Sequence, residues 1–158
     1  MTGVLDPRDG WTADRCPMAG TLYVLSTRTA FLVLREAFYG ATRFEQFVER
    51  AQVSEPVAAS RLRELTAAGL LARVPYQEPG QRGRYEYQLT DKGADLAPAL
   101  VALMDWGDRW AITGGARVAL KHAGCGAPVH AELRCAEGHL VASSDLELTA
   151  KRRSAPQH

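Results

Sequence analysis

The stretch RFEQFVERAQVSEPVAASRLRELTAAGLLARVPYQEPGQRGRYEYQLTDKG, residues 43–93, decides the fold. Within it, Ala58, Leu62 and Leu65 recur at i, i+4 and i+7, a spacing typical of one buried helical face. Ser54 is a good N-cap for a helix that starts near Glu55, and Gly69 fits the position just after the helix end. The opposite face carries small, polar and basic residues: Pro56, Ala59, Ser60, Arg63 and Ala67. A DNA major groove admits a helix of this girth.

A shorter helix is predicted directly before this one. Thr42 and Glu45 form the T-x-x-E pattern of a capping box. An apolar stripe follows, made of Phe44, Phe47, Val48 and Ala51. Only Gln52 and Val53 then separate the two helices, which is the short connection of a helix-turn-helix.

Two strands are predicted after the helix pair. Residues 71–74 form a short apolar run, and residues 84–89 alternate between apolar and polar side chains. The loop between them, residues 77–83, contains two glycines and Arg82. A helix-turn-helix followed by a basic hairpin predicts an α+β winged helix-turn-helix, mostly helical with a two-stranded wing. A generic small α+β core is the alternative, and the order of the elements favours the winged helix.

The composition of the whole chain limits the other possibilities. At 158 residues it is long enough for one domain plus an appendage, and its net charge of +1 gives no global basic signature. Nucleic-acid binding must therefore rest on local placement of arginines. No apolar run approaches the length of a membrane span, and residues 1–10 lack a signal-peptide pattern. Three cysteines, an odd number, favour a reducing compartment, so we expect a cytoplasmic protein that does not use the membrane.

Catalytic chemistry is not indicated. The sequence offers no glycine-rich phosphate loop, no Ser/His/Asp arrangement, and no paired carboxylates with a histidine on one helix face. We therefore expect a protein that is not an enzyme and requires no cofactor.

Three segments, CPMAGTLYVLSTRTAFLVLREAFYGATRFEQF, RLRELTAAGLLAR and RYEYQLTDKG, occur in this order and resemble the HxlR-type family of bacterial winged-helix transcriptional regulators. The matching motifs are Arg35-Glu36, Arg43-Phe44, Arg61-Leu62-Arg63-Glu64-Leu65, and Arg84, Glu86, Tyr87, Leu89 and Thr90. The resemblance implies a homodimer that binds palindromic operator DNA, and repression is the expected direction of control. Where the family usually has Trp and Leu, this chain has Thr29 and Ala58, so either the core repacks or room opens for an effector.

Double-stranded DNA is thus the expected partner. We predict base contacts from the outward face of the second helix, and phosphate or minor-groove contacts from arginines around it. The candidate DNA-binding residues are Arg43, Ser54, Pro56, Ala59, Ser60, Arg63, Arg82 and Arg84. Arg61 lies beside the buried stripe, so an ion pair with a neighbouring acid is expected instead. The alternative function is a winged-helix protein–protein interaction module, which would favour acids or bulky apolar groups at the outward positions.

A long helix is predicted from Thr90 towards Ile112, with a kink near Pro98. Its apolar positions are more numerous than one globular side requires, and the excess suggests a partner chain. The candidate dimer-interface residues are Leu96, Leu100, Leu103, Trp106 and Trp110. The alternative is that the C-terminal extension folds back over Trp106. On this reading residues 1–112 form a DNA-binding and dimerisation domain.

Cys16 is a redox-sensing candidate. Pro17 fits the first position of a helix that Cys16 caps, and a helix N-terminus together with Arg15 favours the thiolate. Some members of the resembled family sense oxidants or electrophiles through a cysteine in this place. One alternative is that Cys16 is an inert cap cysteine. Another is that the regulator responds to a small molecule rather than to an oxidant.

Residues 113–158 are predicted to form a small β-rich appendage with a basic tail at Lys151-Arg152-Arg153. Four residues in it offer a Cys₂His₂ set for zinc, which takes such ligands tetrahedrally: His122, Cys125, Cys135 and His139. Against this set, neither half shows the C-x-x-C spacing of a strong zinc ribbon. The histidines could simply be exposed, and the cysteines could be unligated or pair on oxidation.

Overall fold

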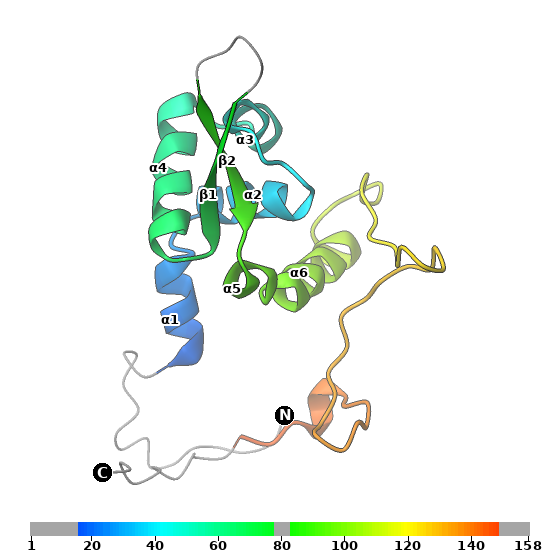
Figure 1. Cartoon of the computed structure of the whole chain (residues 1–158). Helices are drawn as coiled ribbons and strands as arrows, with labels where there is room; N and C mark the ends of the chain where they lie inside the picture. The colour runs from blue at the N-terminus through cyan, green and yellow to red at the C-terminus, as the bar shows by residue number, and fades with distance from the viewer. Residues whose placement is uncertain (1–15, 78–82, 149–158) are drawn as a thin grey trace, which may run out of the picture.

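The computed structural model describes residues 16–77 and 83–148 (Figure 1). Arg15, Arg82 and the basic tail therefore lie outside the described residues. In chain order the elements are α1 (Pro17–Val24), α2 (Arg28–Phe38), α3 (Phe44–Ala51), α4 (Glu55–Ala67), β1 (Leu71–Tyr76), β2 (Arg84–Leu89), α5 (Asp91–Ala94), α6 (Ala97–Trp110) and a short 3-10 helix (Ser143–Asp145). This order confirms the predicted α+β winged helix.

The core forms where α2, α3, α4 and the wing meet. α2 packs against α3, α4 and β2, while β1 packs against α4. On α4 the predicted inward residues Ala58, Leu62 and Leu65 are all fully buried, and the two leucines belong to one core cluster with Leu34 and Phe47 from the neighbouring helices. Because this face is fixed in the core, the opposite face of α4 is presented outwards.

Both ends of α4 lie where the sequence predicts them. Ser54 is the N-cap, with extended backbone, and Gly69 follows the C-cap with a φ of +73°. The turn before α4 is closed by Gln52, which adopts a left-handed conformation with a φ of 53°. The helix-turn-helix connection is therefore confirmed.

The predicted capping box of α3 is wrong by one residue. α3 begins at Phe44 with Arg43 as N-cap. The Gln46 side chain, rather than that of Glu45, reaches back and accepts hydrogen bonds from the N–H groups of Thr42 (2.9 Å) and Arg43 (3.0 Å). Glutamine fills the N3 position of a capping box as well as glutamate does, which explains the shift.

The wing is an antiparallel pair in which Leu71 faces Leu89 and Tyr76 faces Arg84. Its base is tied to the rest of the domain because the Tyr87 N–H donates to the Thr42 carbonyl at 2.8 Å. The Tyr87 ring also meets Phe47 edge to face, with ring centroids 6.0 Å apart. These contacts hold the wing at a fixed position beside α4.

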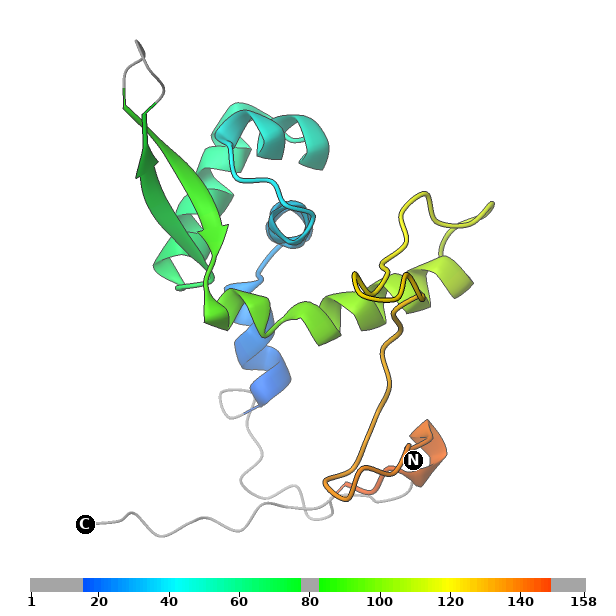
Figure 2. The same cartoon turned by 45° about the vertical axis from the view of Figure 1, so that its right-hand side comes forward.

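The long helix predicted after Thr90 is in fact two helices. α5 ends at Ala94, α6 begins at Ala97, and Pro98 lies in the first turn of α6 instead of kinking a continuous helix. Pro98 has no N–H to bond the Ala94 carbonyl, which accounts for the break just before it. Gly93 in α5 packs closely on Leu70, and a Cβ atom there would lie 2.2 Å from the Leu70 carbonyl oxygen. α5 is thereby pinned to the start of β1, and α6 leaves in a new direction (Figure 2).

The extension after Ile112 is less regular than the predicted β appendage. Over residues 113–148, its pairing consists of two isolated antiparallel bridges, Lys121 with Pro128 and Arg134 with Leu140. Nearly all of its side chains are exposed. Without a buried apolar face, such short segments do not support a sheet.

Candidate DNA-binding surface

The outward face of α4 is the central feature of the candidate surface. Pro56 and Arg63 are exposed on it, and Ala59 and Ser60 are half-buried. α4 runs beside the wing, and its N-terminal end lies towards the same end of the molecule as the end of β1 and the start of β2 (Figure 1). A helix and a hairpin that project together can contact the groove and the adjacent backbone of one duplex.

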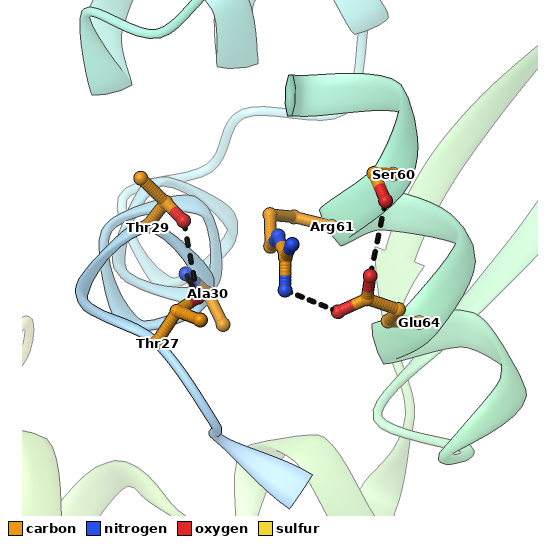
Figure 3. A network of polar contacts seen from close by, with 6 residues as sticks. All are labelled: Thr27, Thr29, Ala30, Ser60, Arg61 and Glu64. Carbon is orange, nitrogen blue, oxygen red and sulfur yellow. Dashed lines mark hydrogen bonds and ion pairs between the residues drawn. The ribbon is translucent and has the colours of Figure 1, made fainter. Parts of the chain in front are cut away.

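A polar network fixes one flank of this face (Figure 3). The Ser60 Oγ donates a hydrogen bond to Glu64 Oε1 at 3.0 Å, and Arg61 Nη1 donates to Glu64 Oε2 at 2.5 Å. The Arg61 side chain extends towards the first turn of α2, where the small side chains of Thr29 and Ala30 leave space for it. The predicted ion pair of Arg61 is confirmed, and its partner is Glu64.

The predicted wing arginines differ in how freely they face solvent. The guanidinium carbon of Arg43 lies 3.3 Å from the centre of the Tyr76 ring, and its Nε lies 3.8 Å from Glu86 Oε2. Arg84 is more exposed and pairs with Glu45 at 3.4 Å. Arg43 therefore braces the loop end of the wing, whereas Arg84 can exchange its surface partner for a phosphate at small cost, because exposed ion pairs contribute only about 0–1 kcal/mol.

Sequence reasoning missed Arg73, an exposed basic residue on β1 whose guanidinium carbon lies 4.1 Å from the centre of the Tyr85 ring. The signal was present, because along residues 72–76 the less polar Ala72, Val74 and Tyr76 alternate with Arg73, which places Arg73 on the exposed side of the strand. Ser54, also predicted to contact DNA, is exposed at the start of α4.

The predicted dimer residues divide into two groups. Leu103, Trp106 and Trp110 are exposed on α6, with 54%, 61% and 70% of their surface accessible. Leu96 packs against the chain's own core, and Leu100 is half-buried beside α2. A second exposed apolar surface lies on α1 and is formed by Met18, Leu22 and Tyr23.

A cavity of about 230 Å³ lies between α2 and α6. Its walls are mainly apolar, from Phe31, Phe38, Leu100 and Met104, and Leu120 of the extension contributes to them. Tyr39 lines it too, and its hydroxyl donates to the Met104 Sδ at 3.4 Å. Burial raises the pKa of Tyr39, and the charge of nearby Arg35 only partly opposes this, so the hydroxyl is a neutral donor at physiological pH.

The extension docks on α6 through two aspartates. Asp105 accepts a hydrogen bond from the Ala131 N–H at 2.9 Å and lies 3.5 Å from His130 Nδ1, while Asp108 accepts from the Ala116 N–H at 2.7 Å. The Ala131 N–H, followed by His130, lowers the pKa of Asp105. These contacts lie near Trp106, but Trp106 itself remains largely exposed, so the extension does not cover it.

The predicted redox and metal residues lie apart from this surface. Cys16 is partly exposed at the N-cap of α1. His122 Nδ1 lies 3.3 Å from Cys125 Sγ on one turn, while Cys135 and His139 occupy a separate turn closed by their own backbone hydrogen bond. Across residues 16–77 and 83–148, no group of three or more potential metal ligands comes together. A zinc site built from all four residues stays a prediction, which elemental analysis of untagged protein tests.

In the same described part of the chain, no helix is long and apolar enough to cross a membrane.

Known proteins share this architecture. An HTH-type transcriptional regulator of Mycobacterium tuberculosis, Rv3095, itself uncharacterized, is 40% identical over 115 residues, which are 72% of each chain. The solved structure of PA1607, a proposed transcription factor, is 33% identical and superposes with a TM-score of 0.76 over 87% of this chain and 96% of its own. That coverage exceeds the winged-helix part alone, so the similarity takes in the extension. The redox regulator HypR in its oxidized form is 26% identical, with a TM-score of 0.55 over 62% of this chain and all of its own.

The sequence profile of the HxlR-like helix-turn-helix family matches residues 24–114, from the end of α1 through the whole of α6. This match spans the helix-turn-helix, the wing and the helix that follows them. The chain belongs to the HxlR-like helix-turn-helix family of DNA-binding transcriptional regulators.

Proposed function

We propose that the protein is a homodimeric, sequence-specific repressor that binds a palindromic operator through α4 and the wing. The observation that carries this proposal is the outward face of α4. It combines small side chains, which allow close approach, with one long arginine that can reach base edges, and it stands beside an exposed basic hairpin. A protein-interaction module would instead favour acids or bulky apolar groups there. Its place of action would be the cytoplasm, where the DNA lies.

Dimerisation is proposed from the exposed apolar residues of α1 and α6. Single exposed apolar residues are ordinary, but clusters of them on two helices that project from the core are typical of an interface. A dimer that pairs these helices about a two-fold axis would present two copies of α4 to the two half-sites of one operator. Helix-turn-helix dimers bind half-sites about one helical turn, or a multiple of it, apart, which is why a palindrome is the expected operator.

The signal that we propose is oxidation of Cys16. HypR, a structural relative, is described as a redox regulator with both reduced and oxidized forms, which supports a thiol signal in this fold. In this chain Cys16 is accessible at the start of α1, one of the two proposed dimer arms. Its oxidation would act on DNA binding by changing how the two protomers pair.

The cavity between α2 and α6 favours a second candidate signal, a small apolar molecule. The volume suits a ligand with one or two rings, and Tyr39 supplies a hydroxyl whose present acceptor is a weakly accepting thioether. Because α2 packs against α4 and α6 forms the proposed dimer arm, a ligand there would touch both the reading element and the pairing element.

Selection of bound sequences from a pool of random duplexes tests the proposed function. We expect enrichment of an inverted repeat bound by two chains. Recovery of no enriched sequence from the pool, with measurable binding of a protein partner instead, would favour the interaction module.

A further inference from the structure

We propose that Ser60 reads an exocyclic amino group in the major groove, of cytosine or adenine, as a hydrogen-bond acceptor whose direction is set by Glu64. This inference rests on the proposed function, because it requires α4 to enter the groove. It assigns a specificity role to Ser60 and a positioning role to Glu64 and Arg61.

Ser60 lies on the outward side of α4. Ala58, Leu62 and Leu65 fix the inward side of α4, and helical geometry then places residue 60 close to the middle of the opposite side. Pro56 lies one turn before it along α4 and Arg63 one turn after it, and both are exposed. A hydroxyl at this place faces whatever the outward side of α4 contacts.

The hydroxyl proton of Ser60 is engaged by Glu64. A serine hydroxyl has one proton to donate and two lone pairs that accept, whereas a carboxylate only accepts. The 3.0 Å contact from Ser60 Oγ to Glu64 Oε1 therefore consumes the single proton of Ser60 (Figure 3). What the hydroxyl still offers to a base is its lone pairs.

The carboxylate of Glu64 is itself held in place by Arg61. Glu64 Oε2 accepts from Arg61 Nη1 at 2.5 Å, and the Arg61 side chain lies towards α2 with only 22% of its surface exposed. This anchor keeps the carboxylate turned towards Ser60. The arginine charge also reduces the repulsion that an acidic group near DNA phosphates would otherwise cause.

The accepting lone pairs of the hydroxyl are complementary to only two of the four bases. In the major groove the amino groups of cytosine and adenine are donors, while guanine presents only acceptors and thymine an acceptor and a methyl group. A hydroxyl that can only accept a hydrogen bond pairs favourably with the amino group of cytosine or adenine. Opposite guanine or thymine it would place one acceptor against another, which forms no hydrogen bond. One operator position in each half-site should therefore favour cytosine or adenine.

The test is selection from random duplexes with four proteins: wild type, Ser60→Ala, Glu64→Ala and, as a matched control, Glu49→Ala, an exposed glutamate on α3. In the wild type we expect one position per half-site to favour cytosine or adenine by roughly three- to tenfold, the size of one net hydrogen bond. Ser60→Ala should remove the preference at that position alone. Glu64→Ala frees the hydroxyl to donate as well as accept, so it should bring all bases at that position to within about twofold of each other. Glu49→Ala should leave the position as in wild type.

Three results would overturn the inference: guanine or thymine preferred at the position that Ser60→Ala affects, no position affected by Ser60→Ala, or a preference that survives Glu64→Ala. In each of these cases the wild type still selects an operator, so the proposed function stands. If the wild type enriches no sequence at all, the proposed function and this inference fail together. Circular dichroism of all four proteins confirms that the substitutions leave the fold intact.

Discussion

At the scale of single residues, Arg63 decides how the outward face of α4 reads DNA. Its side chain is exposed, and arginine bound to guanine through two hydrogen bonds is the commonest specific contact in the major groove. Arg63→Ala should weaken operator binding by about 1–3 kcal/mol and relax the preference at one base pair. Fluorescence anisotropy with the operator and with single-base variants measures both effects, and Arg109→Ala on α6 is the matched control. An unchanged affinity and an unchanged preference would show that α4 is not the reading helix.

Cys16 is the second residue with a testable role. Diamide should release the wild-type protein from its operator and leave Cys16→Ser bound, because oxidation needs the partly exposed thiol at the start of α1. Cys125→Ser, which removes another exposed thiol, should behave as wild type. Equal release of wild type and Cys16→Ser would contradict a role for Cys16 in the response.

At the scale of elements, the joint between the wing and α6 depends on Gly93. A Cβ atom there would lie 2.2 Å from a backbone oxygen of Leu70, and backbone cannot move aside as a flexible side chain can. Gly93→Ala should therefore lower the free energy of unfolding by about 1–3 kcal/mol, as overpacking typically does. Gly83→Ala, where a Cβ atom meets nothing within 4 Å, should have little effect. Chemical denaturation of both variants checks the prediction, and equal stabilities would contradict the close approach.

The same joint shows where sequence reasoning stops. α4 and the wing were predictable because their own residues carry the pattern: a buried stripe at helical spacing, an N-cap, a glycine after the end, and alternation along β2. The break at Asp95–Leu96 was predictable only in part. Pro98 indicates an interruption near the start of this helix, because it has no N–H to bond the Ala94 carbonyl, although Leu96, Leu100 and Leu103 continue a helical period across the break. The close packing of Gly93 on Leu70 was not predictable, because the two residues are distant in sequence. The candidate site shows the same division between features that local sequence carries and features that depend on the folded structure. The outward positions of α4 were predictable, whereas the Ser60–Glu64 hydrogen bond and the stacking of Arg43 depend on side-chain geometry.

At the scale of the whole molecule, dimerisation should depend on the exposed arms. Leu103→Asp places a charge on the exposed face of α6 and should shift a dimer towards monomer. Leu140→Asp is the control, since Leu140 is equally exposed but lies in the extension. Analytical ultracentrifugation measures both. A Leu103→Asp protein that remains fully dimeric would move the interface away from this part of α6.

The docking of the extension on α6 should depend on pH through Asp105. Its pKa is lowered in the folded chain, so the stabilisation from its hydrogen bond with Ala131 is present above the ordinary aspartate pKa of about 3.9 and is lost only as the pH falls through the lower folded value. Hydrogen exchange at the Ala131 amide should therefore stay slow from pH 8 down to about 5, after correction for intrinsic rates. Asp105→Ala should speed this exchange throughout this pH range, and an amide that exchanges equally fast in both proteins would contradict the docking.

The salt dependence of operator binding tests the central claim, recognition of duplex DNA by α4 and the wing, most directly. Each phosphate contact should contribute about −0.9 to the slope of log affinity against log salt, so a dimer with six such contacts gives a slope of roughly −5. Arg84→Ala removes one proposed phosphate contact from each protomer and should reduce the steepness by about two. We predict a steep slope for wild type and a shallower one for this variant. A flat dependence in wild type, or slopes that are identical in the two proteins, would contradict the account.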